Sequence, residues 1–164
     1  MTVNEGFIVI AMEPQQFHNA TPLLSLMPYK RFDTEITVRP DDIDMNNHVH
    51  GSKYLDYVLF ARYDQMARCY GMPMDEFIKQ GWAWYQKTFH IEYKRELNIG
   101  EKVTVRTWLD SFEKADVTVG FLVLKANGKV SAEGYFVSTM INMQSGRAEA
   151  IPEWIIKQYA QFAE

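Results

Sequence analysis

Cysteine is almost absent from this sequence. Cys69 is the only cysteine among 164 residues, so an intramolecular disulfide framework is excluded. A chain without disulfides fits the reducing cytoplasm, which is the compartment we expect. Cys69 lies among apolar neighbours in a predicted helix, and we therefore interpret it as a thiol of the core rather than as a nucleophile.

Long hydrophobic runs and an excess of positive charge are also missing. The apolar run at residues 7–12 is too short to span a membrane, and no positively charged leader precedes it. The formal net charge of -4 argues against broad nucleic-acid binding, although it permits a local basic patch for phosphate. We therefore expect neither a membrane nor a nucleic acid as a partner.

The rest of the composition is that of an ordinary globular domain. Hydrophobic residues make up 47% of the chain and charged residues 23%. The length of 164 residues suits one domain with a core of reasonable size.

A long helix over residues 52–70 is the predicted centre of the domain. Four of its charged residues share one narrow side of the helical wheel: Lys53, Asp56, Asp64 and Arg68. Apolar residues cover the broad opposite arc, so we expect the helix to be largely enclosed. Gly71 and Pro73 end it, because glycine suits the left-handed C-terminal position and proline cannot continue a helix.

An antiparallel sheet is predicted around this helix. Residues 29–39 alternate in the period of a strand that Pro40 ends, and a short helical turn is expected at residues 74–80. Four further strands are predicted at residues 82–95, 102–112, 115–126 and 130–143. Their links are short, and Asn127-Gly128 is a two-residue hairpin signal. These elements predict an α+β domain in which the sheet wraps the helix, followed by an amphipathic helix that begins at Pro152.

The loop before the central helix concentrates polar side chains at a helix N-terminus. The first amides of a helix lack internal partners and carry the positive end of its dipole, so they stabilise an oxyanion. Our candidates for an oxyanion hole are four backbone N-H groups, those of Val49, His50, Gly51 and Ser52. The side chains within reach are Asp42, Asp44, Asn46 and His48. The alternative is that Asp and Asn only cap and turn the chain here, and for Asp42 we favour that role.

Two motifs resemble one known family. Residues 42–49, D-I-D-M-N-N-H-V, followed by Tyr54, are similar to the D-x-D-x-N-x-H-V segment before the central helix of hotdog-fold thioesterases, most closely the acyl-acyl-carrier-protein branch. Residues 92–96, E-Y-K-R-E, are similar to the E-Y-R-R-E segment of the same branch. The resemblance implies a single hotdog domain at residues 30–145. It leaves an N-terminal extension at residues 1–29 and a C-terminal helix, within residues 146–164, packed on the domain.

The resemblance also implies a thioesterase and a set of catalytic residues, which hydrolyse an acyl thioester by carboxylate-assisted attack of water. The residues that match the family motifs are Asp44, Asn46, His48 and Glu96. Asp44 and Glu96 are expected to activate water or to orient the other groups, and either one can be the base or nucleophile. Asn46 is expected to orient or polarise the carbonyl, and His48 to carry a proton. The plant-type pattern has a cysteine where this chain has Leu97, so a thiol nucleophile is excluded there.

A thioester substrate needs an apolar channel and a site for its carrier. Aromatic residues make up 14% of the chain and there are 9 Met, which is material for a channel between sheet and helix. Candidates for its lining, which equally fit a filled core, are Tyr54, Tyr57, Val58, Trp82, Trp84 and Phe89. Candidates for binding the pantetheine phosphate of coenzyme A (CoA) or acyl carrier protein (ACP) are Lys53, Lys94 and Arg95.

Several alternatives accompany this interpretation. His48 and His50 form an H-x-H pair, but spacing places no third ligand, so we expect no metal and no cofactor. The resemblance implies a homo-oligomer, a dimer or a dimer of dimers, with the active site shared between subunits. A hotdog hydratase or dehydratase would hydrate an enoyl thioester without releasing thiol, and a non-catalytic acyl-thioester binding protein would show no turnover.

Overall fold

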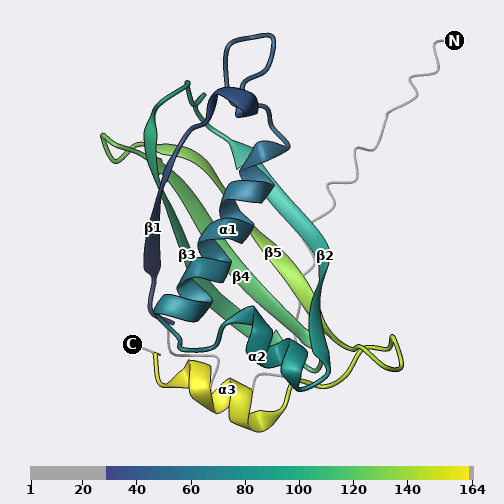
Figure 1. Ribbon diagram of the computed structural model, residues 1–164. Helices are drawn as coiled ribbons and strands as arrows, with labels where there is room; N and C mark the ends of the chain where they lie inside the picture. The colour runs from purple at the N-terminus through teal and green to yellow at the C-terminus, as the bar shows by residue number, and fades with distance from the viewer. Residues whose placement is uncertain (1–28, 163–164) are drawn as a thin grey trace, which may run out of the picture.

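A five-stranded antiparallel sheet curves around one long helix in the computed structural model, which describes residues 29–162 (Figure 1). The strands lie in the order β1-β3-β4-β5-β2. Their bounds are β1 (Phe32–Thr37), β2 (Trp82–Tyr93), β3 (Lys102–Glu113), β4 (Asp116–Lys125) and β5 (Val130–Asn142). The helices are α1 (Lys53–Arg68), α2 (Met74–Lys79) and α3 (Glu153–Ala160), and a 3-10 turn, η2, spans Pro40–Asp42. The predicted α+β fold is confirmed.

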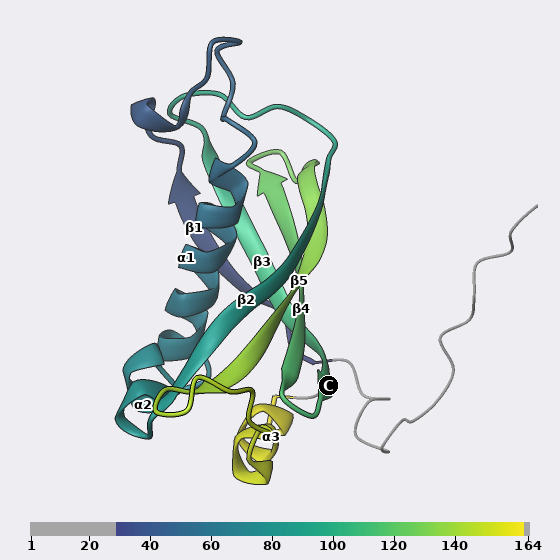
Figure 2. The same ribbon diagram turned by 90° about the vertical axis from the view of Figure 1, so that its right-hand side faces the viewer.

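Helix α1 lies against the concave face of the sheet (Figures 1 and 2). A buried polar side chain, Gln65, ties it there: its amide nitrogen donates to Thr34 Oγ1 at 3.0 Å and to the Val105 carbonyl at 3.3 Å. The Thr107 hydroxyl donates to its amide oxygen at 2.5 Å. Because these partners stand on β1 and β3, the bonds fix the rotation of α1 about its axis as well as its position.

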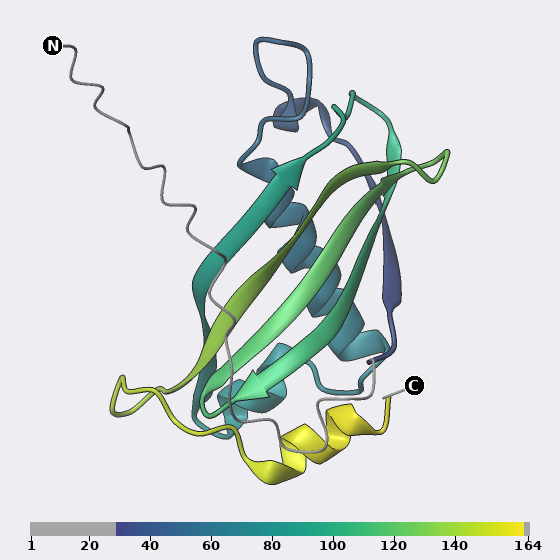
Figure 3. The ribbon, with the colours of Figure 1, turned by 180° about the vertical axis from the view of Figure 1, so that it is seen from behind.

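The enclosure of α1 is less complete in the protomer than the sequence predicted. Phe60 and Tyr63 are 59% and 44% exposed, because the sheet covers the helix from one side only. Figure 3 shows the opposite face of the sheet, which no helix of residues 29–162 covers.

The edges of the sheet differ in length. Strand β1 has 6 residues and pairs with β3, whereas β2 has 12 residues and, among the described residues, pairs only with β5. A long strand with one unpaired side is therefore exposed next to α1.

The predicted hairpin between β4 and β5 is present, but its predicted two-residue turn was wrong. The Lys125 N-H donates to the Lys129 carbonyl at 2.9 Å, which leaves residues 126–128 in the loop. Gly128 has φ 79°, a conformation that favours glycine, and its N-H donates to the Lys125 carbonyl at 2.8 Å.

Helix α3 closes the lower end of the domain in Figure 1 and begins directly after Pro152, as predicted. Its Ile155 and Tyr159 are buried, and the Tyr159 ring contacts the ring of Tyr70 with centroids 4.8 Å apart. The first 28 residues of the predicted N-terminal extension lie outside the described residues, so the proposed domain boundaries stay predictions. No helix among residues 29–162 is long and apolar enough to cross a membrane.

Candidate active site

The loop before α1 is fixed by a buried carboxylate, Asp42. Its side chain is fully enclosed and accepts hydrogen bonds from Arg39 Nε and Nη2, both at 3.1 Å, and from the Tyr57 hydroxyl at 2.7 Å. Lys53 Nζ lies 3.8 Å from the same carboxylate. The Asp42 carbonyl also accepts a hydrogen bond from the His50 N-H at 2.8 Å. Asp42 therefore stabilises both the start and the end of the loop.

Ionisation of Asp42 is favoured by these contacts. The Arg39 guanidinium lowers the pKa of the carboxyl most, burial opposes that shift, and the Tyr57 hydroxyl lowers it further. In turn, burial and then the Asp42 carboxylate raise the pKa of Tyr57. We infer that Tyr57, predicted to line the substrate channel, instead positions the loop, because its only polar atom is committed to Asp42.

Asp44 organises the tip of the loop. Its Oδ1 accepts the backbone N-H of Asn46 at 2.8 Å and that of His48 at 3.3 Å, and its own N-H donates to the His48 carbonyl at 2.8 Å. Asn47 permits this tight turn by adopting φ 63°. The backbone bonds, that of Asn46 first, lower the pKa of Asp44 despite its partial burial, so the carboxylate is ionised at neutral pH.

The end of β2 meets this loop at one end of the molecule (Figure 1). A backbone bond from Val49 N-H to the Leu97 carbonyl, 2.9 Å long, joins the two segments. Between them lies a shallow groove of about 390 Å³, the mouth groove, next to the N-terminus of α1. Its lining consists of Asp44, His48, Val49, Gly51, Tyr54, Tyr93, Lys94, Arg95 and Glu96. Three of the four predicted catalytic side chains therefore line one surface, and the exposed Asn46 is outside it.

Backbone hydrogen bonds within the loop leave fewer free N-H groups for the predicted oxyanion hole. The N-H groups of Val49 and His50 donate to the Leu97 and Asp42 carbonyls, so the prediction was wrong for these two groups. The Ser52 N-H donates to the His50 ring at 3.2 Å. Gly51 N-H has no acceptor among residues 29–162, and it lies in the mouth groove at the end of α1. It is the one amide of the four that is open to an oxyanion.

Aromatic side chains predicted to line the substrate channel fall into different places. Tyr54 lines the mouth groove, where its ring meets that of Tyr93 with centroids 5.1 Å apart. Val58 is fully buried, and Phe89 stacks on Phe121 at 5.2 Å. Trp82 lines a small hollow together with Trp154 and residues of α2, and it does not line the groove. Val58 therefore belongs to the hydrophobic core, and Phe89 packs against it.

The three predicted phosphate ligands are also placed differently. Lys94 and Arg95 line the mouth groove, whereas Lys53 does not and instead lies 3.6 Å from Asp56. Arg95 Nη1 donates to the Val130 carbonyl at 2.8 Å, which leaves its other donors for a ligand. Lys94 contacts Glu92 and Glu133, and these carboxylates raise its pKa, so it stays charged.

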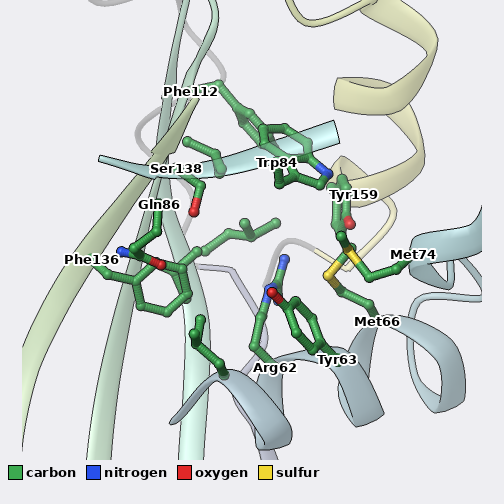
Figure 4. A pocket seen from close by; sticks show the side chains of 14 residues that line it. Arg62, Tyr63, Met66, Met74, Trp84, Gln86, Phe112, Phe136, Ser138 and Tyr159 are labelled. Atoms are coloured by element: carbon green, nitrogen blue, oxygen red, sulfur yellow. The ribbon is translucent and has the colours of Figure 1, made fainter. Parts of the chain in front are cut away.

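A second, interior cavity of about 50 Å³ lies between α1 and the sheet, and Figure 4 shows it from close by. Trp84, which the sequence predicted to line a substrate channel, lines this cavity. Arg62 also lines it and was missed by the sequence analysis. The available signal was its position: residues 54, 58 and 62 follow the helical repeat, so Arg62 is a charged residue on the apolar face of α1. Among residues 29–162, no group of three or more His, Cys, Asp or Glu side chains could hold a metal ion.

Comparisons with known proteins identify the family and the fold of the chain. A family model described as the thioesterase-like superfamily matches residues 38–159, which include both motifs and the whole mouth groove. No curated protein sequence matches the chain significantly.

Solved structures share the hotdog fold. A DHNA-CoA thioesterase from Staphylococcus aureus is 20% identical with a TM-score of 0.74, covering 80% of this chain and 89% of that one. A hypothetical protein from the same organism, solved in complex with CoA, is 22% identical with a TM-score of 0.73 and coverages of 83% and 85%. A hypothetical protein from Thermus thermophilus is 27% identical with a TM-score of 0.74 and coverages of 81% and 98%.

Proposed function

The chain belongs to the thioesterase-like superfamily, and from this we propose that it hydrolyses an acyl thioester to a free acid and a thiol at the mouth groove. One observation carries the proposal. Asp44, His48 and Glu96, which lie up to 52 positions apart in the sequence, line a single groove beside a helix N-terminus with one open N-H group. Carboxylates to activate water and a donor for the carbonyl oxygen are what thioester hydrolysis requires.

We assign Asp44 as the group that holds the attacking water. Its Oδ1 is occupied by two backbone N-H groups, whereas Oδ2 accepts no hydrogen bond from residues 29–162. Water held by a carboxylate oxygen attacks the thioester carbon, and its proton passes to a carboxylate, Asp44 or Glu96. The thioester carbonyl oxygen, which becomes negative, accepts a hydrogen bond from the Gly51 N-H. The carbon-sulfur bond then breaks, and the thiolate takes up a proton, for which His48 is the carrier.

The leaving group makes modest demands on such a site. A thiol resembling that of cysteine has a pKa of about 8.5, so the thiolate leaves more readily than an amine. Asn46 acts in this scheme by holding Asp44. Its backbone N-H donates to the Asp44 carboxylate, and its side chain, which lies outside the groove, also lowers the pKa of Asp44.

The carrier of the acyl group is proposed to enter past Lys94 and Arg95. Both side chains line the groove, and a pantetheine phosphate is an anion that they can pair with. CoA and ACP both present that phosphate. The fold neighbour solved with CoA supports CoA as the first carrier to test.

We propose a homodimer formed along β2. The free edge of this 12-residue strand can pair with the same edge of a second copy, which would extend the sheet across both subunits. Large apolar side chains are exposed beside this edge on β2 and α1: Tyr85, Tyr93, Phe60 and Tyr63. Since the mouth groove includes Tyr93 at the end of β2, it would lie at the dimer interface and take residues from both subunits.

Free-thiol release from a panel of short, long and aromatic acyl-CoA thioesters tests the function. We expect Asp44→Asn to lower kcat/KM by roughly 100-fold or more, the size of a general-base contribution, and Glu96→Gln to lower it at least about 10-fold. The matched control is Asp41→Asn, because Asp41 is an exposed carboxylate next to the loop but outside the groove. Hydrolysis that is unchanged in both groove variants would remove this site, and enoyl-thioester hydration without thiol release would replace the reaction.

A further inference from the structure

Arg62 is a buried cation without a carboxylate partner in the described part of the chain. Its residue is 5% exposed, and its Nη1 is a buried nitrogen with no hydrogen-bond acceptor. The guanidinium rises from α1 into the interior cavity (Figure 4). The free energy of leaving a charged donor unpaired in an apolar interior is large, so an unpartnered arginine there requires an explanation.

A second unsatisfied donor lines the same cavity. The indole Nε1 of Trp84, on β2, is also buried without an acceptor. Arginine and tryptophan nitrogens can only donate hydrogen bonds, so neither can satisfy the other. Two donors from opposite walls, one of them positively charged, select an acceptor group with negative charge.

The aromatic residues around Arg62 stabilise its charge but offer it no negatively charged acceptor. The guanidinium carbon lies 5.0 Å from the centre of the Tyr70 ring and 5.6 Å from that of Tyr159. The positive charge of Arg62 and the contact of its guanidinium with the Tyr70 hydroxyl oppose the rise that burial imposes on the pKa of Tyr70, although this contact is not a well-formed hydrogen bond. The two tyrosines therefore hold the cation without offering it a negatively charged acceptor.

Most of the rest of the cavity wall is apolar: Leu59, Met66 and Leu109 contribute to it, together with the aromatic rings of Phe112 and Phe136. The polar side chains of Gln86 and Ser138 also line the cavity, and neither carries a charge. Its volume of about 50 Å³ exceeds the roughly 10–15 Å³ that one water needs, so it admits a group of a few atoms such as a carboxylate. A mostly apolar wall, with one cation and no carboxylate, matches a carboxylate carried on a hydrocarbon body.

We propose that this cavity binds the carboxylate at the far end of the acyl group, so that the substrate class is a thioester of a dicarboxylic acid. The inference rests on the proposed function only for the thioester at the near end of the substrate. Binding of the carboxylate at the far end does not depend on hydrolysis. Arg62 accepts the carboxylate through its fork of N-H donors, and Trp84 Nε1 donates to it from β2.

The position of Arg62 predicts a chain length. It lies nine residues beyond Lys53, the first residue of α1, which at about 1.5 Å per residue is roughly 14 Å from the helix N-terminus. An extended carbon chain with bonds of about 1.5 Å advances roughly 1.3 Å per bond, so about ten or eleven bonds cover that distance. We expect the strongest preference for acyl groups near this length.

The test compares thioesters that differ only at their far end. Thiol release is measured with CoA thioesters of dicarboxylic acids and of the methyl-terminated acids of equal length, from about six to fourteen carbons. We expect wild type to favour the dicarboxylic member about 10- to 100-fold in kcat/KM near the predicted length, the value of one charge-assisted bond pair. Arg62→Met, which keeps the apolar stem, should abolish this ratio, and Arg62→Lys should restore part of it. The control Arg147→Met removes an exposed arginine far from the cavity and should keep the ratio.

Binding of free dicarboxylic acids, measured by calorimetry with no thioester present, separates the two proposals. Saturable binding that Arg62→Met removes, with no hydrolysis of any thioester, would sink the proposed function and keep the carboxylate site. Hydrolysis without preference at any length, and without Arg62-dependent binding of diacids, would overturn the carboxylate site and leave buried water as the partner of the two donors. Should Arg62→Met fail to fold, Trp84→Phe removes the second donor and must lower the same ratio and the same binding.

Discussion

Replacement of Asp42 by asparagine tests whether this residue organises the active-site loop. Asp42→Asn keeps the shape of the side chain and an acceptor for the Tyr57 hydroxyl, but removes the charge that faces Arg39 and Lys53. The Arg39 side chain is 58% exposed, so water screens that pair and its loss contributes at most about 1 kcal/mol. The bond to Tyr57 is enclosed and weakens from a charge-assisted to a neutral one, which costs about 1–2 kcal/mol.

Together these losses give about 1–3 kcal/mol of the free energy of unfolding. For a chain of this size each kcal/mol lowers Tm by roughly 2–4 °C, so we expect a fall of roughly 2–12 °C at pH 7. Thermal unfolding followed by circular dichroism measures it. The control is Asp41→Asn, whose side chain is 75% exposed and whose nearest cation is 3.9 Å away, and it should change Tm by less than about 2 °C.

The dependence on pH gives the same reasoning a second test. The folded-state pKa of Asp42 is lowered, so its stabilising effect is present above the unfolded value of about 3.9 and is lost as pH falls through the folded value. The Tm difference between wild type and Asp42→Asn should therefore be full at pH 6–7 and shrink below about pH 4. An equal Tm at pH 7, or a difference that stays constant into acid, would refute the assignment of Asp42 as the anchor.

Two further predictions concern the sheet and the subunit interface. At Gly134 an added Cβ would lie 2.0 Å from the His90 carbonyl oxygen, so Gly134→Ala should force β2 and β5 apart and lower the free energy of unfolding, measured in urea, by about 3 kcal/mol. In the exposed turn residue Gly146 the same change should lower it by only about 1 kcal/mol, and equal losses would contradict the clash. Tyr85→Glu places a charge on the proposed interface and should convert a dimer into a monomer in light scattering, with an unchanged circular dichroism spectrum. A variant that remains dimeric would move the interface away from β2.

The elements of the fold were predictable because their signals are local. Asn127-Gly128 specifies the turn between β4 and β5 through the positive φ of the glycine. Gly71, with φ 63°, and Pro73 end α1 within two residues of the predicted position. Each signal depends on a few neighbouring residues, so one sequence contains all the information required.

The site was only partly predictable because its contacts are not local. The meeting of Asp44 with Glu96 came from a resemblance, and the bond from Val49 N-H to the Leu97 carbonyl, which joins their two segments, has no pattern in the sequence. Helical periodicity placed Tyr57 on the inner face of α1 but not its hydroxyl on Asp42. The same periodicity marks position 62 as inward without showing whether a partner meets the arginine there. The inward face of a helix follows from the sequence of that helix alone, whereas a contact between two elements depends on the sequences of both.

The long free edge of β2 has a consequence for folding as well as for assembly. A row of unpaired backbone donors and acceptors is a template for any strand, including that of a misfolded copy. If like edges pair, the correct partner removes that template, and the free energy of unfolding becomes a function of protein concentration. Dilution would then lower Tm, and the nascent chain would be most prone to aggregate before its first encounter with a second copy. Self-association would in this way protect the solubility of the protein.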